Sequence, residues 1–103
     1  MDLADLMQNT GLTPTQKKVY EGMIQQYAEA MQNEEWDWQR TANDPLSPMI
    51  KDMAGNILAG HHRFIAAEVA GVQIPAGVVK VFASSGARVP RSWSEVVVVS
   101  GVR

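Results

Sequence analysis

Cysteine is absent from the chain, which excludes disulfide bonds, thiol catalysis and thiolate metal sites. Long hydrophobic stretches are absent as well, since no uninterrupted apolar run exceeds four residues, the length reached at positions 96–99. A run that short cannot cross a membrane as a helix. Residues 1–5 are acidic where the first region of a signal peptide would be basic, so we expect no signal peptide. Histidine is scarce, with two in 103 residues, and the two are adjacent.

The remaining composition is typical of one folded domain. The chain is 46% hydrophobic and 19% charged, which fits a globular protein and excludes a disordered one. Residues 1–40 carry seven acids against three bases, whereas residues 41–103 carry four acids against six bases. The C-terminal part is therefore better suited to face an anion, while a pI near 5.6 argues against a nonspecific coat of nucleic acid.

Two helix starts are expected near the N-terminus. Asp2 is placed to cap a short helix that ends before Gly11. Residues 13–16, Thr-Pro-Thr-Gln, have the pattern of a capping box with proline at the first helical position. Apolar residues then recur at spacings of three and four, so we expect an amphipathic helix from Thr13 to about residue 32. Its methionines and tyrosines are interpreted as core, with a partner surface as the alternative.

Short strands around one helix are expected in the rest of the chain. In order, we expect an extended segment at 36–38, a loop at 43–48, hairpin strands at 49–53 and 57–58, a helix between Gly60 and Gly71, a strand at 77–82, a loop at 84–91 and a strand at 96–99. Helices followed by strands around a central helix imply an α+β fold. We expect one domain over residues 1–103, with N-terminal helices at 1–33 and a core at 46–103.

The two histidines stand in the sequence Gly60-His61-His62-Arg63, at the first turn of the expected central helix. Unpaired amides and the helix dipole attract anions there, and a glycine admits a ligand close to the backbone. The Arg63 guanidinium suits phosphate oxygens, and imidazoles can transfer protons near neutral pH. The turn therefore predicts a phosphate site, with the two histidines pointing in different directions.

Structural alternatives are open for these side chains. One histidine can cap the helix or pack under the sheet, and Arg63 can pair with Glu68 or Asp52. Zinc is disfavoured, because adjacent histidines without cysteine or an obvious third ligand lack the usual spacing. Asp52 can supply a carboxylate to a divalent ion, or it can be a residue of the turn.

A longer pattern surrounds the turn: Ile50-x-Asp52-x-x-Gly55-x-Ile57-Leu58-x-Gly60-His61-His62-Arg63, followed by Ala66-Ala67, Gly71 and Ile74-Pro75. With this pattern, residues 46–83 resemble the core of the ParB/sulfiredoxin superfamily. In sulfiredoxins the matching turn is Gly-Cys-His-Arg, which implies that His62 and Arg63 bind nucleotide phosphate. His61 stands where the reactive cysteine would be, so sulfiredoxin chemistry is excluded. The ParB proteins of chromosome partitioning match only Gly60 and Arg63 in this turn.

The Gly-His-His-Arg form, together with Pro-Arg-Ser-Trp-Ser-Glu-Val at 90–96, is most similar to ParB-like domains at the C-terminal ends of bacterial polymorphic toxins. That resemblance implies a secreted nuclease toxin, delivered into the cytoplasm of a competitor and neutralised by a cognate immunity protein. DNA is expected as the substrate ahead of RNA, and no membrane partner is expected. Trp93 has a structural alternative, which is to cover the open end of the core.

Phosphodiester cleavage is the mechanism this resemblance favours. Gly60 and the backbone after it would hold the phosphate, and Arg63 would stabilise developing charge. His62 would be the general base or acid, with His61 as the second candidate. Asp52 or Glu68 would orient a histidine or a metal-bound water, and the strand backbone would be held by Arg88 and Arg91.

Two other functions stay open on the sequence. A noncatalytic module would hold a nucleotide such as ATP or CTP at the same turn as a switch. A protein-binding fragment would dock a partner through its methionine and tyrosine helix. Mg²⁺ and a nucleotide are both open as cofactors.

Overall fold

A central helix, α4 (His61–Ala70), lies between two glycines, as the sequence predicts. Gly60 and Gly71 both have a left-handed backbone, with φ of 87° and 69°. The amide of Gly71 closes the helix by donating to the carbonyl of Glu68, and a left-handed residue at this position is a common helix stop. The buried side chains of α4 are His61, Phe64, Ile65, Ala66 and Ala67. The computed structural model describes residues 1–101 of the chain.

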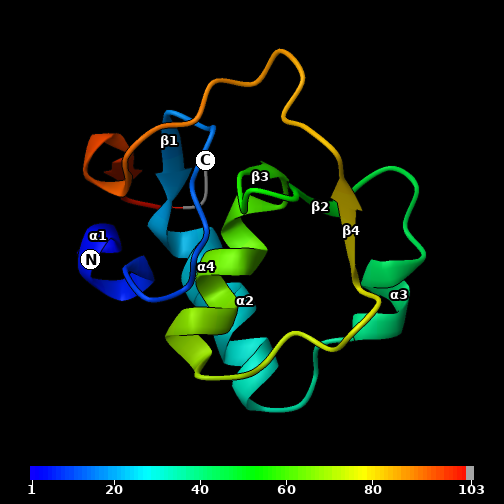
Figure 1. The fold of residues 1–103 in the computed structure, drawn as a ribbon. Coiled ribbons are helices and arrows are strands. Elements are labelled where there is room, and N and C mark those ends of the chain that lie inside the picture. Colours follow the sequence, from blue (N-terminus) through cyan, green and yellow to red (C-terminus); the bar gives the residue numbers. More distant parts are fainter. Residues whose placement is uncertain (102–103) are drawn as a thin grey trace.

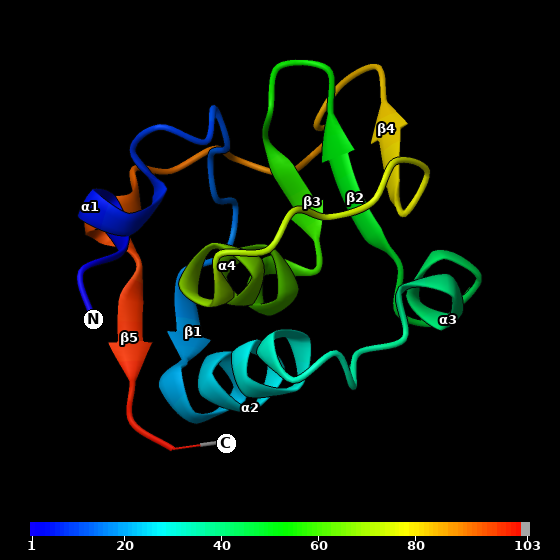
Figure 2. The same ribbon diagram turned by 90° about the horizontal axis from the view of Figure 1, so that it is seen from below.

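A three-stranded sheet covers one side of α4. Its order is β3 (Ile57–Ala59), β2 (Met49–Asp52), β4 (Val79–Phe82), with β2 antiparallel to β3 and parallel to β4. The expected hairpin and the expected strand near residue 80 are thereby confirmed. On the other side of α4 lies α2 (Glu21–Gln32), so that the central helix is buried between a sheet and a helix (Figure 2). The α+β class is therefore correct.

A second sheet joins a segment near the N-terminus to one near the C-terminus. In it, β1 (Lys18–Tyr20) and β5 (Val97–Val99) pair in parallel, with Val19 opposite Val98. The strand near residue 98 was expected from its valines, whereas β1 was not expected. Figure 2 shows β1 and β5 side by side, with β5 next to α1 (Leu3–Met7), close to the N-terminus, and Figure 1 shows α1 near β1. A 3₁₀ turn, η1 (Trp93–Glu95), precedes β5.

The capping box expected at residues 13–16 does not form, and the helix prediction from Thr13 is wrong. The amide of Thr13 donates to the carbonyl of Gly55, and the Thr13 carbonyl accepts from the amide of Ile57. The hydroxyl of Thr15 also donates to the carbonyl of Ile57, at 2.7 Å. Because these bonds reach across to β3 and its turn, the segment stays extended until α2 begins at Glu21. Long-range pairing has overridden the local capping signal.

The extended segment expected at 36–38 is also wrong in part. Asp37 caps a short helix, α3 (Trp38–Ala42), by accepting a hydrogen bond from the amide of Arg40 at 3.0 Å. The alternation of Trp36 and Trp38 therefore reflects aromatic packing. The ring centroids of these two tryptophans lie 6.1 Å apart, and Trp36 packs on Tyr27 at 5.0 Å. The loop at 43–48 follows as expected.

One core joins both sheets and the helices. Its fully buried members come from every part of the chain and include Met7, Val19, Ile24, Met49, Ile57 and Ile65. Trp93 is 9% exposed, and its indole nitrogen donates to the carbonyl of Leu12 at 2.9 Å. Its side chain therefore covers one end of the core, which is the structural role that the sequence left open for it. Of the helices in residues 1–101, none combines the length and the apolar character that a membrane crossing needs.

Candidate functional site

His61 is a buried acceptor of a backbone hydrogen bond. Its side chain is 2% exposed, and its Nε2 accepts from the amide of Thr15 at 3.0 Å. An Nε2 that accepts must be unprotonated, which assigns the proton of the neutral ring to Nδ1. Burial lowers the pKa of His61 to about 4, with smaller contributions in the same direction from Arg88 and His62. The expected packing role of one histidine is thereby confirmed.

His62 makes the same kind of contact at the rim of the turn. Its Nε2 accepts from the amide of Tyr20 at 3.0 Å, and its ring stacks on that of Tyr20 with centroids 6.1 Å apart. The two histidines thus reach different amides of one segment, which joins that segment to the start of α4. The first turn of α4 is consequently an attachment point for β1 as well as a helix start.

Arg63 is anchored by the loop before β2. Nη1 donates to the Ser47 carbonyl at 2.8 Å, and Nη2 contacts the Ser47 hydroxyl at 3.3 Å and the Pro48 carbonyl at 3.1 Å. These acceptors are uncharged, so the expected pairing with Glu68 or Asp52 is not what positions the guanidinium. Burial lowers the pKa of Arg63, and Tyr27 and Asp44 oppose that shift; an arginine stays positive at any physiological pH.

Together these residues line a small cavity, which we call the turn pocket. Its volume is about 190 Å³, and its lining residues are Gln16, Met23, Tyr27, Ser47, Gly60, His61, His62 and Arg63. In the part of the chain that the structure describes, no carboxylate lines it. The amides of Arg63 and Phe64 both donate to the carbonyl of Gly60, and the dipole of α4 places positive partial charge at this helix start.

Asp52 belongs to the hairpin turn between β2 and β3, and it does not line the turn pocket. Its side chain is 3% exposed. Oδ1 accepts from the amides of Ala54 and Asn56, and Oδ2 accepts from the Asn56 side chain at 2.8 Å. The Asn56 side chain is the main reason that the pKa of Asp52 is lowered, while burial opposes the shift. The carboxylate thus shapes the hairpin, and the alternative that made it a metal ligand has no support from its contacts.

The other supporting residues lie away from the turn. Glu68 is exposed and lines a separate apolar groove beside Phe64 and Ile74. Arg88 is exposed in the loop before η1, and its charge acts on the His61 ring. The amide of Arg91 donates to the Pro14 carbonyl. Within residues 1–101, no group of three or more histidine, aspartate or glutamate side chains is arranged to hold a metal ion.

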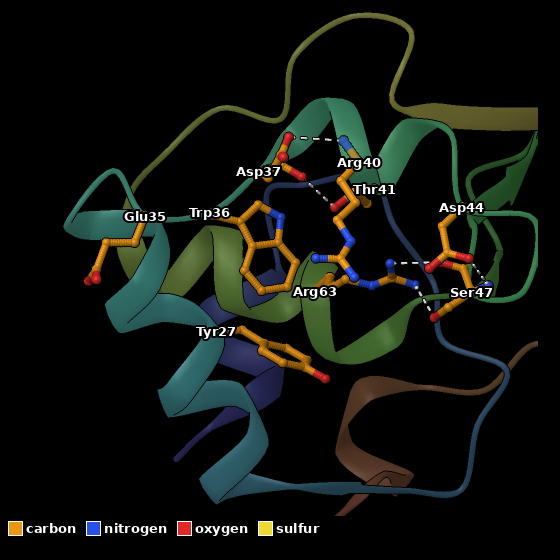
Figure 3. Close-up of a pocket in the computed structure, with 9 residues that line it drawn as sticks. All are labelled: Tyr27, Glu35, Trp36, Asp37, Arg40, Thr41, Asp44, Ser47 and Arg63. Atoms are coloured by element: carbon orange, nitrogen blue, oxygen red, sulfur yellow. Dashed lines mark hydrogen bonds between the residues drawn. The ribbon is translucent and has the colours of Figure 1, made fainter.

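A second cavity, which we call the α3 pocket, adjoins the turn pocket. It has a volume of about 360 Å³ and is lined by Tyr27, Glu35, Trp36, Asp37, Arg40, Thr41, Asp44, Ser47 and Arg63 (Figure 3). Tyr27, Ser47 and Arg63 line both cavities. These neighbours of Arg63 could not be predicted from the sequence, since neither spacing nor motif connects α2, α3 and the loop at 43–48.

Comparison with known proteins found no match at the level of protein families, of curated proteins or of solved structures.

Proposed function

We propose that this domain binds a nucleoside phosphate, with the phosphates at the turn formed by residues 60–63. The observation that carries the proposal is the charge of the turn pocket: a fixed guanidinium and a helix start, with no carboxylate among its described lining residues. Such a surface attracts phosphate oxygens. The resemblance of Gly60-His61-His62-Arg63 to the sulfiredoxin turn supports the same ligand, because its histidine and arginine are the phosphate-binding pair there.

The contacts of the histidines favour binding over acid–base catalysis. A general base must present an unprotonated nitrogen to the proton that it takes. The Nε2 atoms of His61 and His62 are each held by a backbone amide. The low pKa of His61 also leaves that ring neutral at pH 7, so it is not a general acid there. The nuclease toxin function, with His62 as its base and an immunity protein as its partner, stays a prediction.

Calorimetric titration tests the proposal. ATP and CTP are titrated into the wild type, Arg63→Gln and Lys80→Gln, with and without Mg²⁺, and supercoiled plasmid is incubated with the same samples. We expect binding by the wild type and by Lys80→Gln, which removes an exposed charge from β4. We expect at least a tenfold loss in Arg63→Gln, since a hydrogen bond to a charged group contributes about 1.5–3 kcal/mol.

Arg63→Gln needs a folding control, and two results would contradict the proposal. Because Arg63 also anchors the loop at Ser47, near-UV circular dichroism must show that Arg63→Gln is folded, and Arg63→Lys provides a variant that keeps the charge. Absence of binding in the folded wild type would contradict the proposal. Plasmid cleavage by the wild type that disappears in His62→Ala would replace it with the nuclease function.

A further inference from the structure

The α3 pocket has the size of a ligand site and shares Tyr27, Ser47 and Arg63 with the turn pocket. Its volume of about 360 Å³ lies within the roughly 300–1,000 Å³ of small-molecule sites. Figure 3 shows Arg40 extending from α3 and Arg63 from α4 into the region bordered by Tyr27, Trp36 and Ser47. A ligand that contacts Arg63 at one end can therefore enter both cavities.

Aromatic rings form one wall of the α3 pocket. Tyr27 and Trp36 pack with ring centroids 5.0 Å apart and planes tilted by 59°, so they support each other and leave no gap between them. Both side chains are half-buried, which keeps part of each ring accessible from the pocket. An aromatic surface of this kind stacks on the flat face of a nucleobase.

Charge separates the two cavities and sets the orientation of the ligand. The acidic residues Asp37 and Asp44 line the α3 pocket together with two guanidinium groups, while the Glu35 side chain is directed away from it (Figure 3). The turn pocket has the guanidinium of Arg63 and no carboxylate among its described lining residues. Carboxylates repel phosphate, whereas they accept hydrogen bonds from hydroxyl and amino groups. The bonds described for Asp44, from the amides of Leu46 and Ser47, engage only its Oδ1.

We propose that the α3 pocket is the nucleoside subsite of the same ligand. This inference rests on the proposed function, in which the phosphates lie at the turn. The base stacks on Trp36 and Tyr27, the sugar hydroxyls or the base amino group face the carboxylates, and Arg63 contacts the first phosphate. On this arrangement, inorganic polyphosphate should fill only the turn pocket and leave the α3 pocket empty.

Comparison of nucleoside triphosphates with inorganic tripolyphosphate tests the subsite. ATP, CTP, GTP and UTP are each titrated into the wild type, Trp36→Leu and Trp38→Leu. Trp38 is the control: it is half-buried and lies outside the lining of the pocket, and its ring packs on Trp36 with centroids 6.1 Å apart, so Trp38→Leu tests that packing separately from the pocket surface. In the wild type, we expect at least one nucleotide to bind about tenfold tighter than tripolyphosphate, which corresponds to the stacking of one base. Trp36→Leu should remove that difference and leave tripolyphosphate binding unchanged, and Trp38→Leu should retain it.

Asp44→Asn provides a second variant if Trp36→Leu does not fold. The amide oxygen can still accept from Leu46 and Ser47, so the loop is preserved. Loss of the charge should weaken nucleotide binding severalfold and leave tripolyphosphate binding unchanged or tighter. Equal affinity of the wild type for nucleotides and tripolyphosphate would overturn the subsite and leave the proposed function in place. Absence of binding by both would overturn the proposed function itself.

Discussion

His61 is a titratable residue that the fold keeps neutral. Its ring is buried, and its Nε2 accepts the amide hydrogen of Thr15. Protonation of Nε2 would place a charge in the core and would also remove the acceptor of the Thr15 amide hydrogen. The residue therefore links the position of the extended segment 13–20 to pH, and it does so without taking part in chemistry at the turn.

Acid should destabilise the wild type through His61. A histidine ordinarily has a pKa of 6.5, which we take for the unfolded chain, whereas the pKa of His61 in the folded state is about 4. Between these values the unfolded chain binds more protons, so the free energy of unfolding falls as pH falls, by about 3 kcal/mol over the window. Urea denaturation at pH 7, 5.5 and 4.5 measures the loss.

His61→Gln is the control for this slope. Glutamine can accept the Thr15 amide and does not titrate, so this variant should lose much less stability between pH 7 and 4.5. Asp52 contributes in a separate range: its pKa is lowered from 3.8, and the stabilisation it gives is lost only at more acidic pH. Parallel pH profiles for the wild type and His61→Gln would contradict the assignment.

At the scale of elements, the β2–β3 hairpin is held by contacts with a distant segment as well as by its own turn. Asp52 and Asn56 fold the turn, and Gly55 has a φ of 93°. A Cβ at Gly55 would overlap the carbonyl oxygen of Gly11. The extended N-terminal segment thus runs against the hairpin turn, where Thr13 also exchanges hydrogen bonds with Gly55 and Ile57.

Gly55→Ala should therefore cost more stability than Gly77→Ala. Gly77 has a similar φ of 89°, but a Cβ there meets nothing within 4 Å. The left-handed backbone alone costs roughly 1–2 kcal/mol in either variant. The overlap with Gly11 should add about 2 kcal/mol at position 55. Chemical denaturation of the two variants gives the difference directly, and equal losses would mean that the N-terminal segment is not packed on the turn.

The whole molecule is organised around α4, which contacts both sheets and α2. The radius of gyration is 12.8 Å, close to the roughly 13 Å of a 100-residue domain. One core includes residues of α1, β1, α2, β2, β3 and α4. Within residues 1–101, no group of elements has a core of its own, so partial unfolding would expose apolar surface shared with the rest.

Equilibrium unfolding should consequently be a single transition. Trp36 lies beside α3, whereas Trp93 lies in η1 and contacts Leu12. The double variant Trp36→Phe/Trp38→Phe leaves Trp93 as the fluorescent reporter. We expect its fluorescence and the far-UV circular dichroism to follow the same urea curve. A Trp93 transition separated from the circular dichroism transition would show that the β1–β5 pair unfolds independently.

Local signals in the sequence determined much of the fold. Gly60 and Gly71 set the ends of α4, Asp2 predicted α1, and the hairpin followed from its turn residues. Each of these features depends on residues within a few positions of one another. The sequence also placed His61, His62 and Arg63 together at one helix start, because adjacent positions stay adjacent in any fold.

The tertiary structure alone decided what those residues contact. β1 exists because Val19 pairs with Val98 from the opposite end of the chain, and that pairing outweighed a capping box. The acceptors of Arg63 lie in a loop, and the aromatic wall beside it comes from α2 and the segment before α3. Hydrogen bonds and ring packing between distant segments depend on how the core closes, and a local pattern of residues does not encode that closure.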